Sequence, residues 1–347
     1  MKRLRIAMFH ASLPAVHRKI GGVEAAVHRL ADTLARDASL DVTVFSCDEK
    51  PRGALYGHRR IFPSALRSRL LRLLLLPAFL NFLDFRAFDV VHTHGDDWFW
   101  LRRRVPTVRT MHGSALREAQ NTTLLRRKLI QYLVYPLERL STWLATRSVA
   151  VGRDTQHLYR CDEIIGNSVD LGCFKPQRKA PFPLIAFIGL WSGRKRGSFA
   201  FSIFLERVLP RFPDAQLHMI SDTAQSHPNV VLHEHPDDAT VAALLASAWA
   251  FCYPSTYEGF GIPYIEAMAA GTAIAATRNS GAFEVLAGGE YGFICEDRDF
   301  GDQLIELLDC PETRCRFAAK GIERAKTFGA DAIAARYLEV YRGVAQC

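Results

Sequence analysis

An acidic, glycine-rich segment in the second half of the chain carries the clearest potential for chemistry. Glu258 follows an apolar run that ends at Pro254, and Glu266 comes later, within a predicted helix. Gly259 and Gly261 remove side chains where a ligand could approach the backbone. The helix start would add unpaired N–H groups and a partial positive charge. This pattern suits a nucleotide-linked sugar, with Glu266 placed to bind the ribose diol and Glu258 to reach hydroxyls of the sugar.

The elements that must position this segment alternate between apolar strands and amphipathic helices. In the first half, a strand (4–9), a helix (23–35) and a strand (41–47) form a βαβ pattern, and the second half restarts it with a strand at 184–190. Such repeats predict parallel sheets. We therefore expect an α/β protein of two Rossmann-like domains that face each other across a cleft. The site is expected in this cleft, at the C-terminal edges of the strands.

Further elements follow the same pattern. Strands are expected at 88–94, 105–112, 148–152, 216–221, 229–235, 250–255, 272–277 and 291–296, with helices at 124–148, 154–160, 199–212, 237–248, 263–270, 299–310 and 311–345. The domains are predicted as 1–174 and 175–347, and the last helix, about 330–347, is a candidate to pack back on the first domain.

Composition and charge exclude several classes of protein. Hydrophobic residues make up 49% and charged residues 23% of the 347 residues, which is typical of globular proteins and not of disordered or fibrous ones. Eight scattered cysteines without zinc-ligand spacing predict free thiols in a reducing compartment. The start lacks the apolar stretch of a signal peptide, so a cytoplasmic location is expected.

The basic excess lies wholly in the first half. Residues 1–175 hold 28 Lys and Arg against 16 Asp and Glu, whereas residues 176–347 hold 16 against 20. Residues 50–83 have no acid and contain Arg59, Arg60, Arg67, Arg69 and Arg72. A basic, partly amphipathic helix on an anionic surface is one interpretation of this stretch, and a core helix with solvated arginines is the other.

The acidic segment also resembles a known signature. YEGFGIPYIEAMAAG (257–271) is similar to the E-x7-E motif of the retaining GT-B fold glycosyltransferases, the family called glycosyltransferase group 1 or family 4. Other stretches resemble family segments in the same order, and together they span most of the chain. They are GGVEAAVHRLA (21–31), FDVVHTHG (88–95), TMHG (110–113), NSVDLGCFKP (167–176) and SGAFEVLAGGEYGFIC (280–295).

The resemblance implies roles for individual residues. His112 matches the family histidine near the transferred sugar, and Gly22 matches the glycine close to the donor phosphates and acceptor. Glu258 matches the acid at the sugar, and Glu266 matches the ribose ligand. The catalytic candidates are His112, Glu258 and Arg196. The donor-site candidates are Gly22, Arg194, Lys195, Arg196, Glu258, Gly259, Phe260, Gly261, Ile262 and Glu266.

The loop GLWSGRKRG (189–197) matches the family with departures. Leu190 stands where the family usually has Arg, and Arg196 stands where it usually has Lys. Arginine binds phosphate through two parallel hydrogen bonds, so Arg196 is a candidate phosphate ligand. Arg194 or Lys195 could supply the charge missing at Leu190, and three solvated cations are the alternative. A second departure is MISDTA (219–224), which lacks the family's glycine-rich turn.

The resemblance implies transfer of a sugar from a nucleotide-diphosphate sugar to an acceptor hydroxyl with retention, in polysaccharide, glycolipid or cell-envelope synthesis. Cations and helix-end N–H groups would stabilise the diphosphate leaving group. No cofactor or metal is expected, and UDP is preferred over GDP on family frequency alone. Expected partners are the nucleotide sugar, a glycan, lipid-linked or small-molecule acceptor, and an anionic membrane surface on which the cytoplasmic protein would be peripheral.

Other functions remain open at this point. A pseudoenzyme that binds a nucleotide sugar is suggested by Leu190, and a sugar-nucleotide epimerase or a phosphorylase could use the same fold. RRR at 102–104 and RRK at 126–128 would serve a nucleic-acid-binding protein. No nucleic-acid-binding motif accompanies them, so nucleic acid is not an expected partner.

Overall fold

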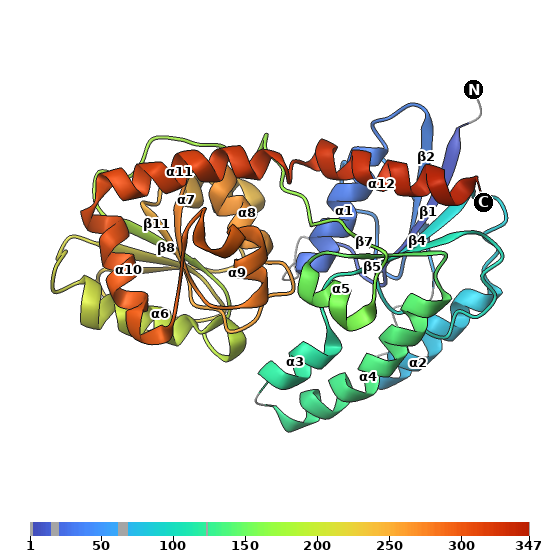
Figure 1. The fold of residues 1–347 in the computed structure, drawn as a ribbon, viewed down its shortest axis with the longest axis horizontal. Helices are drawn as coiled ribbons and strands as arrows, with labels where there is room; N and C mark the ends of the chain where they lie inside the picture. Colours follow the sequence, from blue (N-terminus) through green and yellow to red (C-terminus); the bar gives the residue numbers. More distant parts are fainter. Residues whose placement is uncertain (1–2, 15–20, 62–68, 123, 347) are drawn as a thin grey trace. The chain divides into compact units, whose positions relative to one another are not determined.

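The chain divides into two compact units, each built around one parallel sheet (Figure 1). The structure is a computed structural model that describes residues 3–14, 21–61, 69–122 and 124–346. The first unit comprises residues 1–119, 129–168 and 330–347, and the second comprises 120–128 and 169–329. The prediction of two Rossmann-like α/β halves is confirmed by these two sheets.

The first unit has seven parallel strands in the order β3-β2-β1-β4-β5-β6-β7. The strands are β1 (Leu4–Phe9), β2 (Leu40–Ser46), β3 (Gly57–Arg60), β4 (Val90–Thr93), β5 (Thr107–Met111), β6 (Arg147–Ala150) and β7 (Glu163–Ile164). The helices are α1 (Gly22–Leu34), α2 (Arg69–Phe79), η1 (Leu80–Phe82), α3 (Ala115–Asn121), α4 (Leu125–Leu144), α5 (Arg153–Tyr159) and α12 (Ala330–Ala345). Only the end of α3 and the first turn of α4, within residues 120–128, are grouped with the second unit.

Both faces of this sheet are buried, as expected for a parallel sheet. On one face, Ile6 and Met8 of β1 pack with α1 and with Tyr337 of α12. On the other face, Ala7 and Phe9 pack in a cluster that includes residues of α2. The alternation of side chains along β1 therefore explains how one apolar run serves two helical layers.

The second unit has six parallel strands in the order β10-β9-β8-β11-β12-β13. The strands are β8 (Leu184–Ile188), β9 (Gln216–Ile220), β10 (Val230–His233), β11 (Ala250–Tyr253), β12 (Ala273–Thr277) and β13 (Phe293–Cys295). The helical elements are η2 (Gly193–Lys195), α6 (Gly197–Ile203), the π-helix η3 (Phe204–Val208), α7 (Asp238–Ser247), α8 (Ile262–Ala269), α9 (Ser280–Val285), η4 (Ala287–Gly289), α10 (Asp297–Asp309) and α11 (Pro311–Lys326).

The structure corrects two of the predicted elements. Residues 57–60 form strand β3 on β2, so the basic stretch 50–83 is not one helix. The helical stretch 311–345 is two helices, α11 and α12, because residues 327–329 leave the helix. There, the carbonyl of Phe328 accepts a hydrogen bond from the N–H of Val169 at 2.8 Å, and Gly329 forms an isolated β-bridge with Val169.

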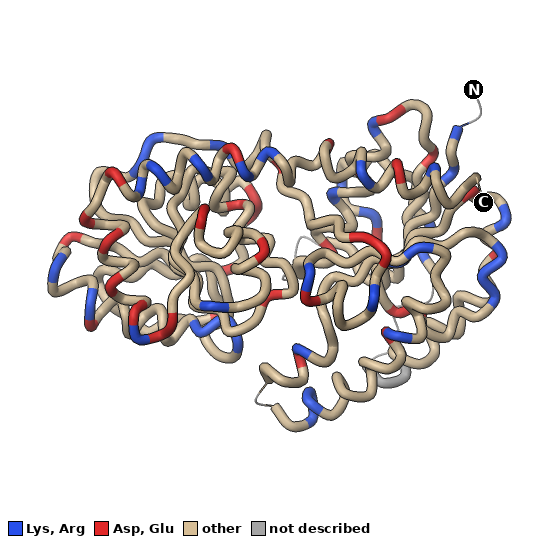
Figure 2. Tube along the Cα trace, viewed as in Figure 1, with Lys and Arg blue, Asp and Glu red and all other residues tan. Residues whose placement is uncertain are grey.

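None of the described helices is both long enough and apolar enough to cross a membrane. Figure 2 shows charges of both signs along α10 and α11, whereas α4 is basic near its start and largely uncharged over the middle of its length. This difference between helices bears on the surface considered below.

Candidate functional site

Each sheet has a topological switch point, where the strand order reverses. It lies between β1 and β4 in the first unit and between β8 and β11 in the second. In open α/β sheets, ligands bind beside the carboxyl ends of the strands at such a point. The candidate residues of the second unit gather at its switch point, and His112 follows β5, next to the switch point of the first.

Glu258 is the centre of the cluster in the second unit. Its Oε1 accepts hydrogen bonds from Lys195 Nζ at 2.6 Å and from Arg194 Nη1 at 2.9 Å. The Ser255 hydroxyl donates to the same oxygen at 2.6 Å. Arg194 also donates to the backbone carbonyl of Tyr257 at 2.6 Å, and Lys195 bonds the Tyr253 hydroxyl. The loop after β8 and the loop after β11 are thus joined through one carboxylate.

The charge of Glu258 is maintained by its neighbours. Burial by itself would raise the pKa of this carboxyl, but the positive charges of Lys195 and Arg194 hold its pKa below the ordinary value. Burial also raises the pKa of the adjacent Tyr253 well above its usual range, so this phenol stays protonated. Glu258 is therefore an ionised hydrogen-bond acceptor, and it is both a weak base and a weak nucleophile.

Two glycines leave the space that this loop needs. Gly261 directly precedes α8 and has a φ of 92°, in the left-handed region that favours glycine. At Gly281, in α9, a Cβ atom would lie 2.6 Å from the carbonyl oxygen of Phe260 and 2.7 Å from Cβ of Glu258. Backbone from two segments thus approaches closely around Glu258.

Arg196 lies in a different environment from its two neighbours. Its guanidinium forms a bidentate pair with the carboxylate of Asp297, with both N–O distances at 2.7 Å, and it lies over the ring of Phe199. It lines an open pocket of about 570 Å³ at the ends of β12 and β13. The other lining residues are Thr256, Thr277, Arg278, Cys295, Glu296, Asp297 and Arg298. Arg196 does not contact Glu258 in the hydrogen-bond pattern, so the three cations separate into two groups.

The loop that carries Leu190 contacts the turn 219–224, and these are the two segments that depart from the family pattern. Leu190 is 40% exposed and brings no charge to the loop. The next residue, Trp191, donates its backbone N–H to the carboxylate of Asp222 at 2.8 Å, so the atypical turn 219–224 holds the cationic loop. Gly189 leaves room for Lys195, because a Cβ atom there would lie 2.7 Å from Cβ of Lys195.

The remaining donor-site candidates are spread over two elements. Glu266 is half-buried in α8, and Ile262 begins that helix. Gly259 precedes the buried Phe260, whose ring packs against Phe328 at 5.6 Å between centroids. In the first unit, Gly22 begins α1, where the carboxylate of Glu24 accepts a hydrogen bond from the N–H of Gly21 at 2.8 Å.

His112 is one member of a chain of neutral rings at the carboxyl ends of β4 and β5. Its Nδ1 lies 3.2 Å from Oδ1 of Asn167, and its Nε2 lies 2.9 Å from Nδ1 of His94. If Asn167 accepts from Nδ1–H of His112, then Nδ1–H of His94 donates to Nε2 of His112. Burial, followed by the positive charges of His10 and Arg109, lowers the pKa of His112 to about 3.

A second layer of rings lies behind this chain and was not identified from the sequence. Nδ1 of His92 lies 2.6 Å from the Tyr341 hydroxyl, and its Nε2 lies 2.8 Å from the Thr110 hydroxyl. Thr110 in turn contacts the Tyr337 hydroxyl at 3.0 Å. The spacing His-x-His at 92–94 was the available signal, since residues i and i+2 of a strand face the same side.

A buried ionic cluster was also missed. Asp97 has no exposed surface and accepts a hydrogen bond from the Ser141 hydroxyl at 2.6 Å. It also pairs with Arg103 at 3.2 Å and with Arg109 at 3.3 Å. Asp97 connects the ends of β4 and β5 to α4.

The arginines proposed for a membrane surface have varied positions. Arg59 lies over the ring of Phe45 on β2, and Arg60 pairs with Glu49 at 3.5 Å. Arg69 and Arg72 lie on α2, and Arg67 falls outside the described residues. The two arginines of β3 therefore pack against the first unit's own residues.

Two Rossmann-like units with an acid–cation cluster at one switch point define the class of the GT-B glycosyltransferases. The model of Glycosyltransferase Family 4 matches residues 20–172, and that of Glycosyl transferases group 1 matches residues 214–324. The chain belongs to this glycosyltransferase family, as the resemblance predicted, and it is an enzyme of the glycosyl-transferring class.

Similar proteins agree with this assignment. A phosphatidyl-myo-inositol mannosyltransferase of Mycobacterium tuberculosis is 27% identical over 94% of each chain. The sucrose-phosphate synthase of Thermosynechococcus elongatus has the same fold, with a TM-score of 0.82 at 19% identity over 98% of this chain and 99% of that one. The Anabaena Alr3699/HepE protein in complex with UDP-glucose has a TM-score of 0.75 at 15% identity, over 98% of this chain and 100% of that one.

Proposed function

We propose that this glycosyltransferase moves a sugar from a nucleotide-diphosphate sugar to an acceptor hydroxyl with retention of the anomeric configuration, and that it requires no divalent metal. The observation that carries the proposal is the buried, ionised Glu258 beneath Arg194 and Lys195 at the end of β11. A carboxylate kept ionised among donors binds sugar hydroxyls well. Two cations beside it suit the charge that develops on a departing diphosphate.

The pKa of Glu258 supports one division of roles among these residues. A carboxylate whose pKa lies below its ordinary value is a poor proton acceptor and a poor nucleophile, so Glu258 would orient the sugar. Arg194 and Lys195 would stabilise the leaving group, with Arg196 reaching from the neighbouring pocket. Glu266 would bind the ribose, and His112, neutral because its pKa is about 3, would accept or donate a hydrogen bond to the sugar.

The donor and acceptor classes rest on the similar proteins. A structural neighbour of the same fold was solved with UDP-glucose, which supports a UDP-sugar before a GDP-sugar. The name of the mycobacterial relative includes a phosphatidyl lipid, which supports a lipid-linked or glycolipid acceptor at the cytoplasmic face of a membrane. The product would then belong to a glycolipid, a polysaccharide or the cell envelope.

A ligand panel tests the donor site. Thermal unfolding is measured with UDP, GDP, ADP and their common sugar conjugates, on the natural chain and on Glu266→Ala. A ligand at about 100 times its dissociation constant stabilises by about 2.7 kcal/mol. We expect stabilisation by one nucleotide that Glu266→Ala removes, with Glu312→Ala, an exposed acid of α11, as the matched control.

Turnover and stereochemistry need a second measurement. With the nucleotide identified, incubation with its sugar conjugate and lipid extracts should release the nucleoside diphosphate, with EDTA leaving the rate unchanged. NMR of the product should show the donor's anomeric configuration. Binding without turnover on any acceptor would favour a pseudoenzyme, and an inverted product would contradict the proposed stereochemistry.

A further inference from the structure

Helix α4 of the first unit carries apolar side chains on its outward side as well as on its inward side, where Val134 is buried and Ile130 and Leu137 pack beside it. Its inward side also makes polar contacts. Glu138 accepts a hydrogen bond from the N–H of Ala115 at 3.1 Å and bonds the Tyr159 hydroxyl. One turn further on, the Ser141 hydroxyl donates to the buried Asp97. A surface helix normally buries its apolar stripe and leaves such polar groups in water.

The outward side of α4 is apolar. Leu129 is 57% exposed, Leu133 is 69% exposed and Trp143 is 79% exposed, and Tyr132 is exposed between them. Tyr132 and Leu133 follow Leu129 by three and four residues, and Trp143 follows it by about four helical turns, so all four lie along one side of the helix. We call these four side chains the α4 face.

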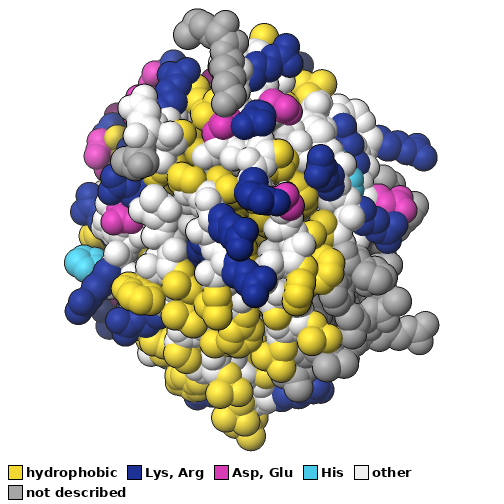
Figure 3. Space-filling model, turned by 90° about the vertical axis from the view of Figure 1, so that its right-hand side faces the viewer, with side chains coloured by type: hydrophobic (Ala, Val, Ile, Leu, Met, Phe, Trp, Pro, Cys, Tyr) yellow, Lys and Arg dark blue, Asp and Glu magenta, His cyan; other side chains and the backbone are white. Residues whose placement is uncertain are grey.

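Neighbouring elements extend this apolar area. Leu73 of α2 packs in one cluster with Ile130 and Leu137 of α4, so the two helices lie together. Leu74 and Leu75 of α2 are exposed beside it. Figure 3 shows a broad hydrophobic area over the lower part of this side of the molecule, bordered by Lys and Arg side chains. A contiguous apolar patch on a soluble domain usually marks an interaction site.

The charges beside the α4 face are positive. Between residues 124 and 137 there is no acid, while the first turn of α4 carries Arg126, Arg127 and Lys128. Arg139 is exposed further along the helix, and its only acid, Glu138, is the inward-facing one just described. Exposed leucines and aromatic rings flanked by arginine are the pattern of a helix that lies in the interface of an anionic bilayer.

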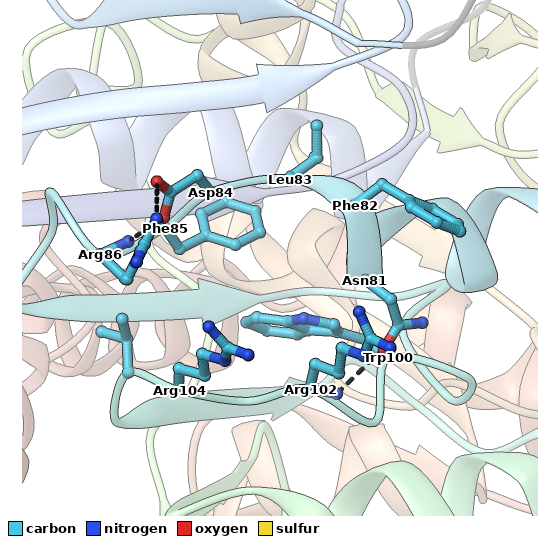
Figure 4. A pocket seen from close by; sticks show the side chains of 10 residues that line it. Asn81, Phe82, Leu83, Asp84, Phe85, Arg86, Trp100, Arg102 and Arg104 are labelled. Atoms are coloured by element: carbon cyan, nitrogen blue, oxygen red, sulfur yellow. Dashed lines mark hydrogen bonds and ion pairs between the residues drawn. The ribbon is translucent and has the colours of Figure 1, made fainter.

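A small basic pocket lies on the same unit, beside η1. Its volume is about 150 Å³, and Arg102 and Arg104 reach it on the side of Trp100 (Figure 4). Asp84 is occupied by Arg86 at 2.9 Å, whereas the side chains of Arg102 and Arg104 have no hydrogen-bond or ion-pair partner among the described residues. Such guanidinium groups suit a lipid phosphate.

The loop that carries these arginines also presents apolar side chains. Oδ1 of Asn81 accepts hydrogen bonds from the N–H groups of Leu101 and Arg102, both at 2.9 Å. This contact fixes the loop to η1, where Phe82 is 79% exposed and Leu101 is 65% exposed. Exposed apolar side chains therefore lie next to Arg102 and Arg104, as the exposed side chains of α4 lie next to its own basic residues.

We propose that the α4 face, with Phe82, Leu101 and the arginines beside them, is a docking surface for an anionic phospholipid membrane. This inference does not rest on the proposed reaction, because it uses none of the residues assigned to the donor site.

Vesicle binding of the full chain tests the proposal without any donor, acceptor or turnover. Vesicles containing about half phosphatidylglycerol should co-sediment with the protein, and phosphatidylcholine vesicles should do so much less. The double variant Leu129→Ser/Leu133→Ser should lower the bound fraction about tenfold. Leu55→Ser changes a residue of the same unit that is 58% exposed and should have no effect.

Two further measurements separate insertion from simple charge attraction. Brominated lipids should quench tryptophan fluorescence on binding, and Trp143→Phe should remove most of that quenching. Arg126→Gln/Arg127→Gln should weaken binding and its salt dependence. Equal binding by the leucine variant, or failure of the natural chain to bind anionic vesicles, would overturn the proposal. So would a dimer in solution that the leucine substitutions dissociate, because a second copy would then be the occupant of this face.

Discussion

The carboxyl ends of the two sheets share a topology and differ in chemistry. Both strand orders reverse after the first strand of the unit, at β1/β4 and at β8/β11. The first unit places neutral rings there, with His112, His94 and His92 in successive contact. The second unit places ions there, with Glu258 between Arg194 and Lys195. Topology therefore decides where a site forms, and the loop residues decide what it binds.

The two ends differ because the histidines of the first unit are buried without an opposite charge among the described residues, whereas Glu258 is buried beside two. Burial lowers the pKa of His92 and His94 well below the usual value, and the neighbouring histidines and then Arg109 add to the cost of a charged ring. At Glu258 the same burial is outweighed by two opposite charges. The first end thus suits hydrogen bonds to uncharged hydroxyls, and the second suits a phosphate-bearing ligand.

Acidification should produce the largest difference in stability between the carboxyl ends of the two sheets. Unfolded histidines bind protons below about pH 6.5, but His92, His94 and His112 resist protonation when folded, so the free energy of unfolding falls as pH drops through 6.5. Between pH 7 and pH 5, the contribution of each of these histidines to the free energy of unfolding should fall by about 2 kcal/mol. The contribution of Glu258, whose folded pKa is depressed, stays intact until pH nears 4.5 and falls below that value. Hydrogen exchange should therefore quicken at β4, β5 and α12 before it quickens at β11.

Two variants serve as controls for this pH effect. His112→Gln should remove about one histidine's share of the pH dependence. His157→Gln, at an exposed ring on α5, should leave it unchanged. Equal acceleration of exchange in both units between pH 7 and pH 5 would contradict the comparison.

Neutralising the acid at the second end should mainly affect catalysis. Glu258→Gln keeps the shape of the side chain but leaves Lys195 and Arg194 without their counter-charge. We expect the turnover number to fall by about 10²–10³. The control is Glu312→Gln, and circular dichroism establishes that both variants fold. Unchanged turnover in Glu258→Gln would remove this residue from the site.

Crowding the backbone at the second end should cost less. Gly281→Ala places a Cβ atom within 3 Å of the carbonyl oxygens of Phe260 and Glu258, so the loop must shift. The expected loss is about 1–3 kcal/mol of unfolding free energy. Gly343→Ala, in α12, meets nothing within 4 Å and should stabilise by about 0.5–1 kcal/mol. Chemical denaturation of both variants measures the contrast, and a Gly281→Ala protein of full stability would show that the loop yields freely.

The smallest effect is expected at the rim of the pocket. Arg196→Lys loses the bidentate geometry with Asp297, but this carboxylate is 56% exposed, so water compensates for much of the loss. A double-mutant cycle with Asp297→Asn should give a coupling of about 0.2–1 kcal/mol in stability. A coupling of several kcal/mol would mean that Arg196 belongs with the buried ions around Glu258.

The apolar patterns predicted the strands well, and polar contacts between distant segments explain the failures. β1, β8 and β12 read as strands because almost every residue in each is apolar and both faces are buried. β3, with the sequence GHRR, gave no such signal, since it forms by pairing with β2 at the sheet edge. The break between α11 and α12 depends on a contact with Val169, which no local pattern contains.

The candidate site shows the same limit. The signature around Glu258 identified a carboxylate and the cationic loop as separate features, but their convergence on one Oε1 required the fold. The role of Asp97 could not be predicted from the sequence because its partners, Arg109 and Ser141, come from other elements. The exposed stripe of α4 was hidden for a similar reason. Amphipathic spacing predicts an apolar side that packs on the protein, and it does not show that a second apolar side of the same helix stays exposed.

The membership of α12 in the first unit has a consequence for the order of folding during synthesis. Ile333, Tyr337 and Tyr341 belong to the core around β1, yet they are translated after the whole of residues 169–329. At about 5–20 residues per second, the ribosome keeps that core open for roughly 10 to 30 seconds. Meanwhile the second unit can fold on its own, so α12 completes the core of the first unit only after residues 169–329 have been made. A nascent chain of this protein therefore exposes the apolar residues that α12 later covers, and chaperones have time to bind them.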